Sequence, residues 1–329
     1  MKFAFENLLL SIQDAQSIVL STHRQCDGDG LGAEMALFHA LKQIKKKVKI
    51  INVDKTAKKY RFLSPDEHIL YFEEHPDTVI QADLVLIFDT NDERLLKPLY
   101  EAFLKSQAKI IFIDHHPRLQ LGPAPTIPSW IDTSAASTGE MAYRIIKGLQ
   151  IPLDVDIARA LYTSITFDTQ LFRYIRNSPV SHEIAAELVR LPIQPQVIHK
   201  HLFGEQTVSK MKLLAQALGQ IEYFDDGRVA SLKLHSEDLR KNNLDPDDAR
   251  DVIDFLMNIE ILEAAVLFRE DGPSLYKLSL RSKGRLEVLD IAETLGGGGH
   301  LYASGALVKG KYETLRDQVV AHLIRSLNK

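Results

Sequence analysis

Acidic and histidine side chains follow four apolar segments of this sequence. Apolar runs of this length are typical of buried strands or buried helix segments. In an open α/β sheet the carboxyl ends of the strands lie along one edge, so side chains that follow several strands can converge there. The apolar segments are 17–21, 84–88, 109–113 and 161–167. The side chains that follow them are His23, Asp27, Asp29, Asp89, Asp114, His115, His116 and Asp168.

Convergence of these side chains would concentrate negative charge. Without cations, four carboxylates in one pocket would repel one another, and some would have to take up protons. Two divalent cations would offset that charge, and His23 and His115 would add neutral nitrogen ligands. Mixed imidazole and carboxylate ligation suits Mn²⁺, with Fe²⁺, Co²⁺ or Zn²⁺ as alternatives and Mg²⁺ less natural. We therefore expect two divalent cations, Mn²⁺ first among them, on these histidines and on Asp27, Asp29, Asp89 and Asp168.

Other uses of an Asp-x-Asp-Gly sequence fit less well. In haloacid-dehalogenase phosphatases the first aspartate directly follows its strand, whereas Asp27 is the fourth residue after His23. An EF-hand calcium loop needs an oxygen ligand where Leu31 stands. A lone aspartate after a strand is more often a helix N-cap than a ligand. Four such positions in order along one chain favour a metal site.

The bulk composition is that of a globular, two-domain chain. Its 329 residues exceed one average domain, and 45% hydrophobic with 26% charged residues argues against disorder. A net charge of −4 argues against coating of long nucleic acid, which calls for many cationic phosphate contacts. The single cysteine, Cys26, excludes an intrachain disulfide and fits a reducing, cytoplasmic location. We expect no signal peptide and no membrane span.

Residues 1–190 alternate short apolar runs with helical patterns. This alternation favours an α/β domain, with a mainly parallel sheet and helices on both faces. An amphipathic first helix precedes the strands expected at 17–21, 48–53, 68–72, 84–88 and 109–113. Helices are expected at 31–44, 94–105, 136–148, 155–166 and 180–190.

The pattern changes after a proline-rich boundary near residue 191. We expect a helical linker over 191–219, with its helix at 205–219, and then a smaller α+β domain over 220–329. Strands are expected at 221–224, 228–234, 261–270, 275–281 and 303–309. Helices are expected at 247–258, 287–295 and 312–327.

A glycine run in this second half could bind phosphate. Glycines let backbone N–H groups approach phosphate oxygens, and His300 could donate to a phosphate or stack on a base. Arg281, at the end of an expected strand, could clamp a phosphate with two hydrogen bonds. The substrate-binding residues expected here are Arg281, Ser282, Gly297, Gly298, Gly299 and His300.

The motifs of the first half resemble those of the DHH phosphoesterase superfamily. The resemblance rests on His23-x₃-Asp27-x-Asp29, Asp89, Asp114-His115-His116 and Asp168, in that order. It implies one metal on His23, Asp27 and Asp89, and a second on Asp29, Asp89, His115 and Asp168. It also implies that Asp89 bridges the metals as a catalytic residue, that Asp114 orients the histidines, and that His116 faces the phosphoryl group.

The second half resembles the DHH-associated substrate-binding domain. Arg281-Ser282, Leu289-Asp-Ile-Ala292 and the GGGGH-x-x-A-S-G segment at 296–305 carry this resemblance, which argues against a family II pyrophosphatase. The compact two-domain form is most similar to the oligoribonuclease/pAp phosphatase branch. That branch implies hydrolysis of short RNA or DNA oligonucleotides and dinucleotides to 5′-mononucleotides, and of pAp to AMP, by metal-activated water.

Several positions depart from the family pattern without removing a ligand. Cys26 stands where proline is usual, Ala33 where serine is usual, and Gln170 where glycine is usual. Arg173 fits a Phe-Arg-Phe/Tyr element, for which substrate contact and a structural ion pair are both open. Ser137 is expected to cap a helix, with contact to phosphate as the alternative.

Two other functions stay open at this point. The same residues would serve a phosphodiesterase for cyclic or linear dinucleotides such as c-di-AMP, pApA or pGpG. A nucleotide-binding regulator without catalysis is less consistent with a complete ligand set, because a degenerate member should have lost a ligand. The oligomeric state is not determined, with a homodimer as one option.

Overall fold

The computed structural model describes residues 2–63, 68–120, 129–204, 207–244 and 250–328. The chain divides into two compact units. The first comprises residues 1–118 and 122–205, and the second comprises residues 119–121 and 206–329. Among the residues described, no helix is both long and apolar enough to span a bilayer.

The first unit is built around a six-stranded sheet in which all paired strands run parallel, as expected for an α/β fold. The strand order is β3-β2-β1-β4-β5-β6. The strands are β1 (Ser17–Thr22), β2 (Lys47–Asn52), β3 (Ile69–Tyr71), β4 (Leu84–Phe88), β5 (Lys109–Asp114) and β6 (Trp130–Ile131). The first five lie where strands were expected, whereas β6 was not expected because a two-residue strand has no periodic pattern.

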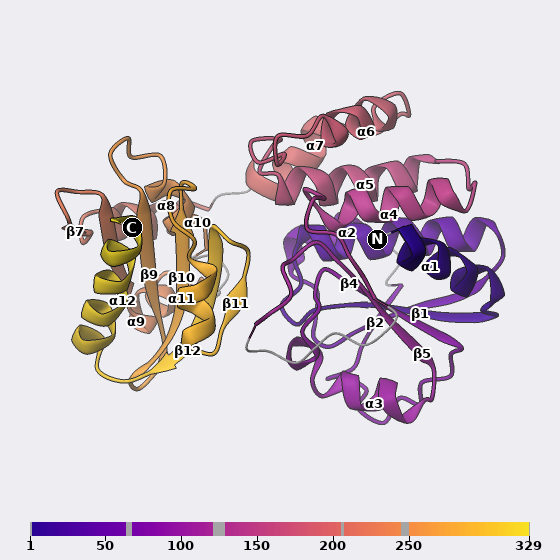
Figure 1. The fold of residues 1–329 in the computed structure, drawn as a ribbon, viewed down its shortest axis with the longest axis horizontal. Helices are drawn as coiled ribbons and strands as arrows, with labels where there is room; N and C mark the ends of the chain where they lie inside the picture. The colour runs from indigo at the N-terminus through magenta and orange to yellow at the C-terminus, as the bar shows by residue number, and fades with distance from the viewer. Residues whose placement is uncertain (1, 64–67, 121–128, 205–206, 245–249, 329) are drawn as a thin grey trace. The chain divides into compact units, whose positions relative to one another are not determined.

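Helices cover both faces of this sheet, and β4 shows why. Its residues Leu84, Leu86 and Phe88 pack in the core that holds α2, α4 and α5, while Val85 and Ile87 pack in the core that holds α3. Figure 1 shows the same two layers. The helices are α1 (Lys2–Asp14), α2 (Gly28–Gln43), α3 (Leu99–Lys105), α4 (Thr138–Gly148), α5 (Val155–Asp168), α6 (Val180–Leu188) and α7 (Pro195–His199).

The described residues of the first unit also form three short helical turns. Two are 3₁₀ turns, at Lys58–Leu63 and Glu93–Leu96, and one is a π-helical turn at Lys200–Gly204. The prediction of one helix over 94–105 is wrong in its first half. A 3₁₀ turn ends before Pro98, and α3 begins only after that proline. Proline lacks the N–H that would continue a helix across this point.

The second unit contains a mixed six-stranded sheet of order β11-β12-β10-β9-β8-β7. Among the strands that the structure describes here, only β8 and β9 pair in parallel; the other pairs are antiparallel. The strands are β7 (Glu222–Phe224), β8 (Val229–Leu234), β9 (Ala264–Gly272), β10 (Leu275–Ser282), β11 (Gly298–Gly299) and β12 (Ala303–Lys309). Strand β11 has only two residues, lies inside the glycine run and was not expected.

Two apolar clusters sandwich this second sheet. One includes side chains of α11 (Leu289–Thr294) and α12 (Tyr312–Leu327). The other includes side chains of α8 (Val208–Leu218), α9 (Ser236–Lys241) and α10 (Arg250–Leu256). Part of the helix expected over 247–258 lies outside the described residues, and the described part forms α10. The linker helix expected over 205–219 is α8, and its Leu213 and Ala217 are buried in this unit.

Helices α2 and α5 approach each other closely at Gly32. A Cβ atom added at Gly32 would lie 2.6 Å from the carbonyl oxygen of Ala160 and 2.7 Å from Cβ of Ser164. Backbone cannot move away as a flexible side chain can, so only glycine fits this crossing. Because α2 begins and α5 ends near the acidic cluster, the crossing also affects the spacing of the residues described below.

We expect Gly32→Ala to lower the free energy of unfolding by about 1–3 kcal/mol, because the added methyl overpacks a closely packed helix pair. Urea unfolding followed by circular dichroism measures the change. Gly219→Ala is the matched control, since the nearest atom to its Cβ would be 3.5 Å away. A Gly32→Ala variant as stable as the Gly219→Ala variant would show that the helices can separate without cost.

Candidate metal centre

The first ligand set lies where β1 leads into α2. His23 follows β1, and Asp27 is the N-cap of α2, with its carboxylate accepting a hydrogen bond from the Asp29 N–H at 3.1 Å. His23, Asp27 and Asp89 each offer a ligand atom within 4.8 Å of the others. The structure thus brings together the three residues that the resemblance assigns to one metal.

Asp89 directly follows β4 and has an unusual backbone. Its φ is +61°, in the left-handed region that non-glycine residues seldom adopt, although aspartate tolerates it better than most. The Asp89 N–H still donates to the carbonyl of Ile113 at 3.0 Å, which ties the turn to β5. Backbone strain of this kind is concentrated at functional sites.

The second ligand set comprises Asp29, His115 and Asp168, whose ligand atoms also lie within 4.8 Å of one another. Nε2 of His115 lies 3.3 Å from Oδ2 of Asp29 and 3.6 Å from Oδ2 of Asp168. Asp89 reaches both sets: its Oδ2 is 3.5 Å from Nε2 of His23, and its Oδ1 is 3.6 Å from Nε2 of His115. A single carboxylate between two ligand sets is the arrangement expected of a bridging ligand.

The amino end of α4 holds Asp29. The N–H groups of Thr138 and Gly139 donate to the two oxygens of Asp29 at 2.8 and 3.2 Å, and the Ser164 hydroxyl donates as well. Ser137 caps α4 by accepting from the Glu140 N–H at 3.2 Å, so the expected N-cap is confirmed. The first N–H groups of α4 are therefore used by a carboxylate of the protein itself.

Asp114 ends β5 and holds His116. One Asp114 oxygen accepts from Nδ1 and from the backbone N–H of His116, at 2.7 and 3.1 Å. The other accepts from the Asn91 side-chain amide at 2.5 Å. Sequence reasoning missed Asn91, although its place two residues after Asp89 could have drawn attention to it.

The orientation of His115 suits a metal ligand. Its Nδ1 lies 3.2 Å from the carbonyl oxygen of Ala135, which can only accept a hydrogen bond. We therefore assign a proton to Nδ1, so that Nε2 is the nitrogen that faces the carboxylates and that would bind a metal after losing its own proton. A backbone carbonyl in this position is a common means of orienting a histidine that binds metal.

Comparison with known proteins gives the family. Residues 17–165 match the DHH family, N-terminal domain, and residues 226–329 match the DHHA1 domain. The chain belongs to the DHH family. The two matches together include all the residues of both expected constellations except Asp168 and Arg173, which lie just beyond the first match.

Two relatives align with this chain over nearly the whole length of both partners. The protein named bifunctional oligoribonuclease and PAP phosphatase NrnA of Thermus thermophilus is 29% identical, over 94% of this chain and 91% of the relative. The protein of the same name from Bacillus subtilis is 27% identical, over 96% of each chain. A crystal structure of an exopolyphosphatase-related protein from Bacteroides fragilis covers 100% of this chain and 98% of its own, with 23% identity and a TM-score of 0.88, and thus has the same fold.

The electrostatics of the DHH domain fit divalent cations. Burial, together with the charges of Asp29 and Asp89, raises the pKa of Asp168 to about 7 despite the attraction of His115. Burial lowers the pKa of His23, but its hydrogen bond to Asp89 and the nearby carboxylates outweigh burial and raise the pKa to about 9. The pKa of His115 is likewise raised, well above its usual value. Protons therefore neutralise the cluster when no cation is bound, and a cation of higher charge would take their place.

Cys26, the unusual neighbour of Asp27, is buried, with 5% of its surface exposed. Burial and the charges of Glu34, Asp54 and Asp27 raise the pKa of its thiol well above the usual value. A thiol held in its neutral form is a poor metal ligand and a poor nucleophile. This favours a space-filling role for Cys26 over a reactive one.

In the DHHA1 domain, packing accounts for much of the glycine run. A Cβ at Gly297 would lie 2.0 Å from the carbonyl oxygen of Gly305, and Gly299 has a φ of +134°. Both glycines therefore allow β11 to pair with β12. The N–H of Gly297 donates to the Ala292 carbonyl and that of His300 to the Ala303 carbonyl, both at 2.8 Å.

Arg281 and Ser282 are also held by neighbours inside the DHHA1 domain. Nε of Arg281 donates to Asp254 at 2.7 Å, and its Nη1 donates to the Leu280 carbonyl at 3.1 Å. The Ser282 hydroxyl donates to the carbonyl of Leu286 at 2.7 Å. These contacts orient both side chains, and a role in substrate binding stays a prediction.

The loop after Asp168 contains Arg173 and the unusual Gln170. Gln170, Leu171 and Phe172 have φ values of +47°, +61° and +64°. The glycine that is usual at position 170 would adopt this conformation without strain. The loop therefore has the left-handed backbone that favours glycine, although glutamine occupies the position. The Arg173 guanidinium lies 5.7 Å from the ring centroid of Tyr174.

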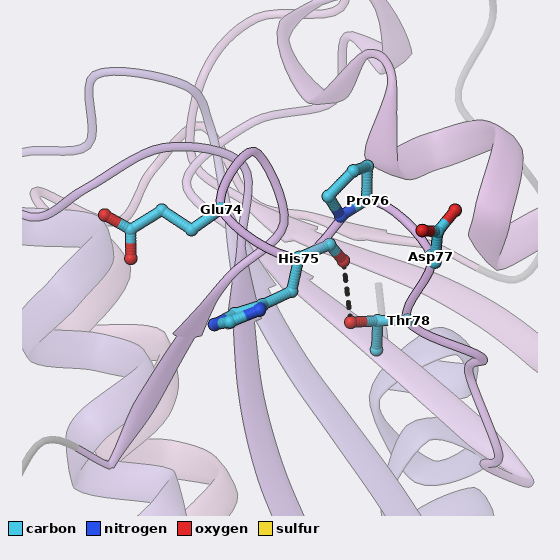
Figure 2. Close-up of a pocket in the computed structure, with 5 residues that line it drawn as sticks. All are labelled: Glu74, His75, Pro76, Asp77 and Thr78. Atoms are coloured by element: carbon cyan, nitrogen blue, oxygen red, sulfur yellow. Dashed lines mark hydrogen bonds between the residues drawn. The ribbon is translucent and has the colours of Figure 1, made fainter.

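A hollow of about 340 Å³ lies elsewhere, at the turn formed by residues 74–78. Figure 2 shows its lining and the hydrogen bond from the Thr78 hydroxyl to the His75 carbonyl, 2.7 Å long. The lining comes from one short segment and includes none of the ligand residues. This hollow therefore has no part in the metal centre.

We expect Mn²⁺ binding to release protons, with an affinity that rises with pH between about 6 and 9. His23, whose pKa is about 9, is protonated at pH 7 in the cation-free protein and must lose its proton to bind a metal. Isothermal titration calorimetry at pH 7 in buffers of different ionisation enthalpy measures the protons released. His23→Gln, which cannot release that proton, is the control. Equal apparent enthalpies in all buffers would contradict the proton displacement.

Proposed function

We propose that this protein is a two-metal phosphoesterase that hydrolyses short oligoribonucleotides and dinucleotides to 5′-mononucleotides, and pAp to AMP. The observation that carries the proposal is the position of Asp89 within reach of both ligand sets. The pairing of a DHH domain with a DHHA1 domain supports it, as do the relatives named for oligoribonuclease and PAP phosphatase activity. Short DNA strands would be alternative substrates.

We further propose which residues act in the DHH domain. His23, Asp27 and Asp89 would hold one Mn²⁺, and the other would lie on Asp29, Asp89, His115 and Asp168. The bound cations would lower the pKa of a water molecule and offset charge on the phosphoryl group.

His116 is the residue that would meet the phosphoryl oxygen. Asp114 accepts from Nδ1 of His116, which fixes the ring, and the Asn91 amide fixes Asp114 in turn. The carboxylates of Asp114 and Asp89 outweigh the effect of burial and raise the pKa of His116. A protonated imidazole can keep its hydrogen bond to Asp114 and donate from Nε2 to an oxygen on which negative charge develops.

Residues 1–190 would form the catalytic domain, 191–219 the linker and 220–329 the substrate-binding domain. Arg281, Ser282, Gly297, Gly298, Gly299 and His300, with Arg173 of the first domain, are the proposed contacts to substrate. The ion pair with Asp254 would keep the Arg281 guanidinium oriented for phosphate.

A cytoplasmic location fits the single cysteine, and a homodimer stays a prediction that analytical ultracentrifugation would test.

Asp89→Ala should lower hydrolysis by at least about 100-fold, because it removes a ligand from both metal sets. Asp83→Ala is the matched control: Asp83 precedes β4 as Asp89 follows it, and its carboxylate accepts from the N–H groups of Gln16 and Ser17. That variant should keep its activity. Near-normal hydrolysis by Asp89→Ala would rule out the bridging role.

The substrate class is tested by a product time course with Mn²⁺ on pAp, dinucleotides, c-di-AMP and a 24-residue RNA. We expect AMP from pAp, mononucleotides from the dinucleotides, and little cleavage of the 24-mer. EDTA should abolish these reactions and excess Mn²⁺ should restore them. Preferential cleavage of c-di-AMP would instead indicate a cyclic-dinucleotide phosphodiesterase.

A further inference from the structure

Thr138, the first residue of α4, contacts two carboxylates of the metal centre at once. Its N–H donates to Oδ2 of Asp29 at 2.8 Å, and its hydroxyl donates to Oδ1 of Asp89 at 3.2 Å. The side chain is fully buried. Nε2 of His115 faces the same two oxygens, 3.3 Å from the first and 3.6 Å from the second, and lies 3.6 Å from Oδ2 of Asp168. Thr138 thus contacts two of the three carboxylate oxygens that His115 faces.

Several contacts hold Thr138 in place. Ser137 caps α4, and Glu140 accepts from the Ala136 N–H at 3.1 Å and from the Ser181 hydroxyl. Gly139 lies so close to α5 that an added Cβ would be 2.3 Å from the Ser164 hydroxyl oxygen. The start of α4 therefore cannot shift without moving α5, so the two donors of Thr138 are presented rigidly.

The charges make such a rigid contact useful. Asp29 and Asp89 are both buried, and their carboxylates face the same nitrogen of His115 at 3.3 and 3.6 Å, so two negative charges lie close together away from water. Two donors on one rigid residue can hold both carboxylates in fixed orientations, each with an oxygen directed at a shared cation. Groups that orient metal-binding carboxylates in this way contribute strongly to metal affinity.

We propose that Thr138 is a positioning residue that couples the bridging carboxylate Asp89 to the Asp29–His115–Asp168 set. This inference rests on the proposed two-metal function. It predicts that loss of the Thr138 hydroxyl weakens uptake of one Mn²⁺ more than the other, because the His23–Asp27–Asp89 set keeps its other two ligands undisturbed.

The test is titration of the metal-free, full-length protein with MnCl₂, with free Mn²⁺ measured by electron paramagnetic resonance. Thr138→Val keeps the shape and the backbone N–H but removes the hydroxyl. We expect the wild type to bind two Mn²⁺, and the variant to bind the second about 10- to 100-fold more weakly. Thr138→Ser, which keeps the hydroxyl, should restore binding.

Thr163→Val is the matched control. Thr163 is a buried threonine of α5 whose hydroxyl donates to the Arg159 carbonyl at 2.8 Å, so the same change there should leave Mn²⁺ binding unaltered. If Thr138→Val does not fold, Thr138→Ala removes the same hydroxyl without a branched side chain.

Two results would overturn the inference alone: wild-type affinity for both ions in Thr138→Val or Thr138→Ala, or equal losses in the serine and valine variants. Failure of the wild type to bind a second Mn²⁺ would instead overturn the proposed two-metal function, and the role of Thr138 with it.

Discussion

Repulsion among buried carboxylates is the constraint on which the DHH domain depends. Asp29 and Asp89 are almost wholly buried, and Asp168 is close to both. Like charges at this spacing raise the energy of the fold unless opposite charges or hydrogen-bond donors face them. In the cation-free protein, the raised pKa of His115 keeps its ring protonated, and this positive charge offsets part of the repulsion. The N–H groups at the amino end of α4 donate to Asp29 and offset more of it. The amino end of α4 is therefore part of the charge compensation at this site.

The residues at the carboxyl edge of the first sheet could be predicted, because a buried parallel strand appears in the sequence as a continuous run of apolar residues. β4 is buried along its whole length, so its end, and Asp89 after it, stand out in the sequence. Asp168 shows where that reasoning weakens. Its preceding apolar run is equally continuous, but it forms the buried part of helix α5 rather than a strand. Periodicity cannot separate these cases, yet both place the carboxylate at the end of a buried element.

The remaining features depend on contacts that sequence spacing does not encode. Thr138 and Asp29 are 109 residues apart, and only the packing of α4 against α2 brings them together. Asn91 reaches Asp114 across neighbouring strands. A polar residue near a motif can face solvent, cap a helix or hold a ligand, and these outcomes differ only in tertiary position. The motif residues were predictable in identity, whereas the donors that orient them were not.

The glycine run of the DHHA1 domain illustrates how one pattern can have two physical causes. Phosphate binding by backbone N–H groups was the reason expected, but pairing of β11 with β12 already requires glycine at Gly297 and Gly299. The N–H groups of Gly297 and His300 are used within the domain. Under the proposed function, selectivity for a short nucleotide would then depend mainly on side chains, such as the Arg281 guanidinium and the His300 imidazole. The glycines would contribute by allowing the tight turn that presents His300, since any larger residue would push β11 away from the sheet.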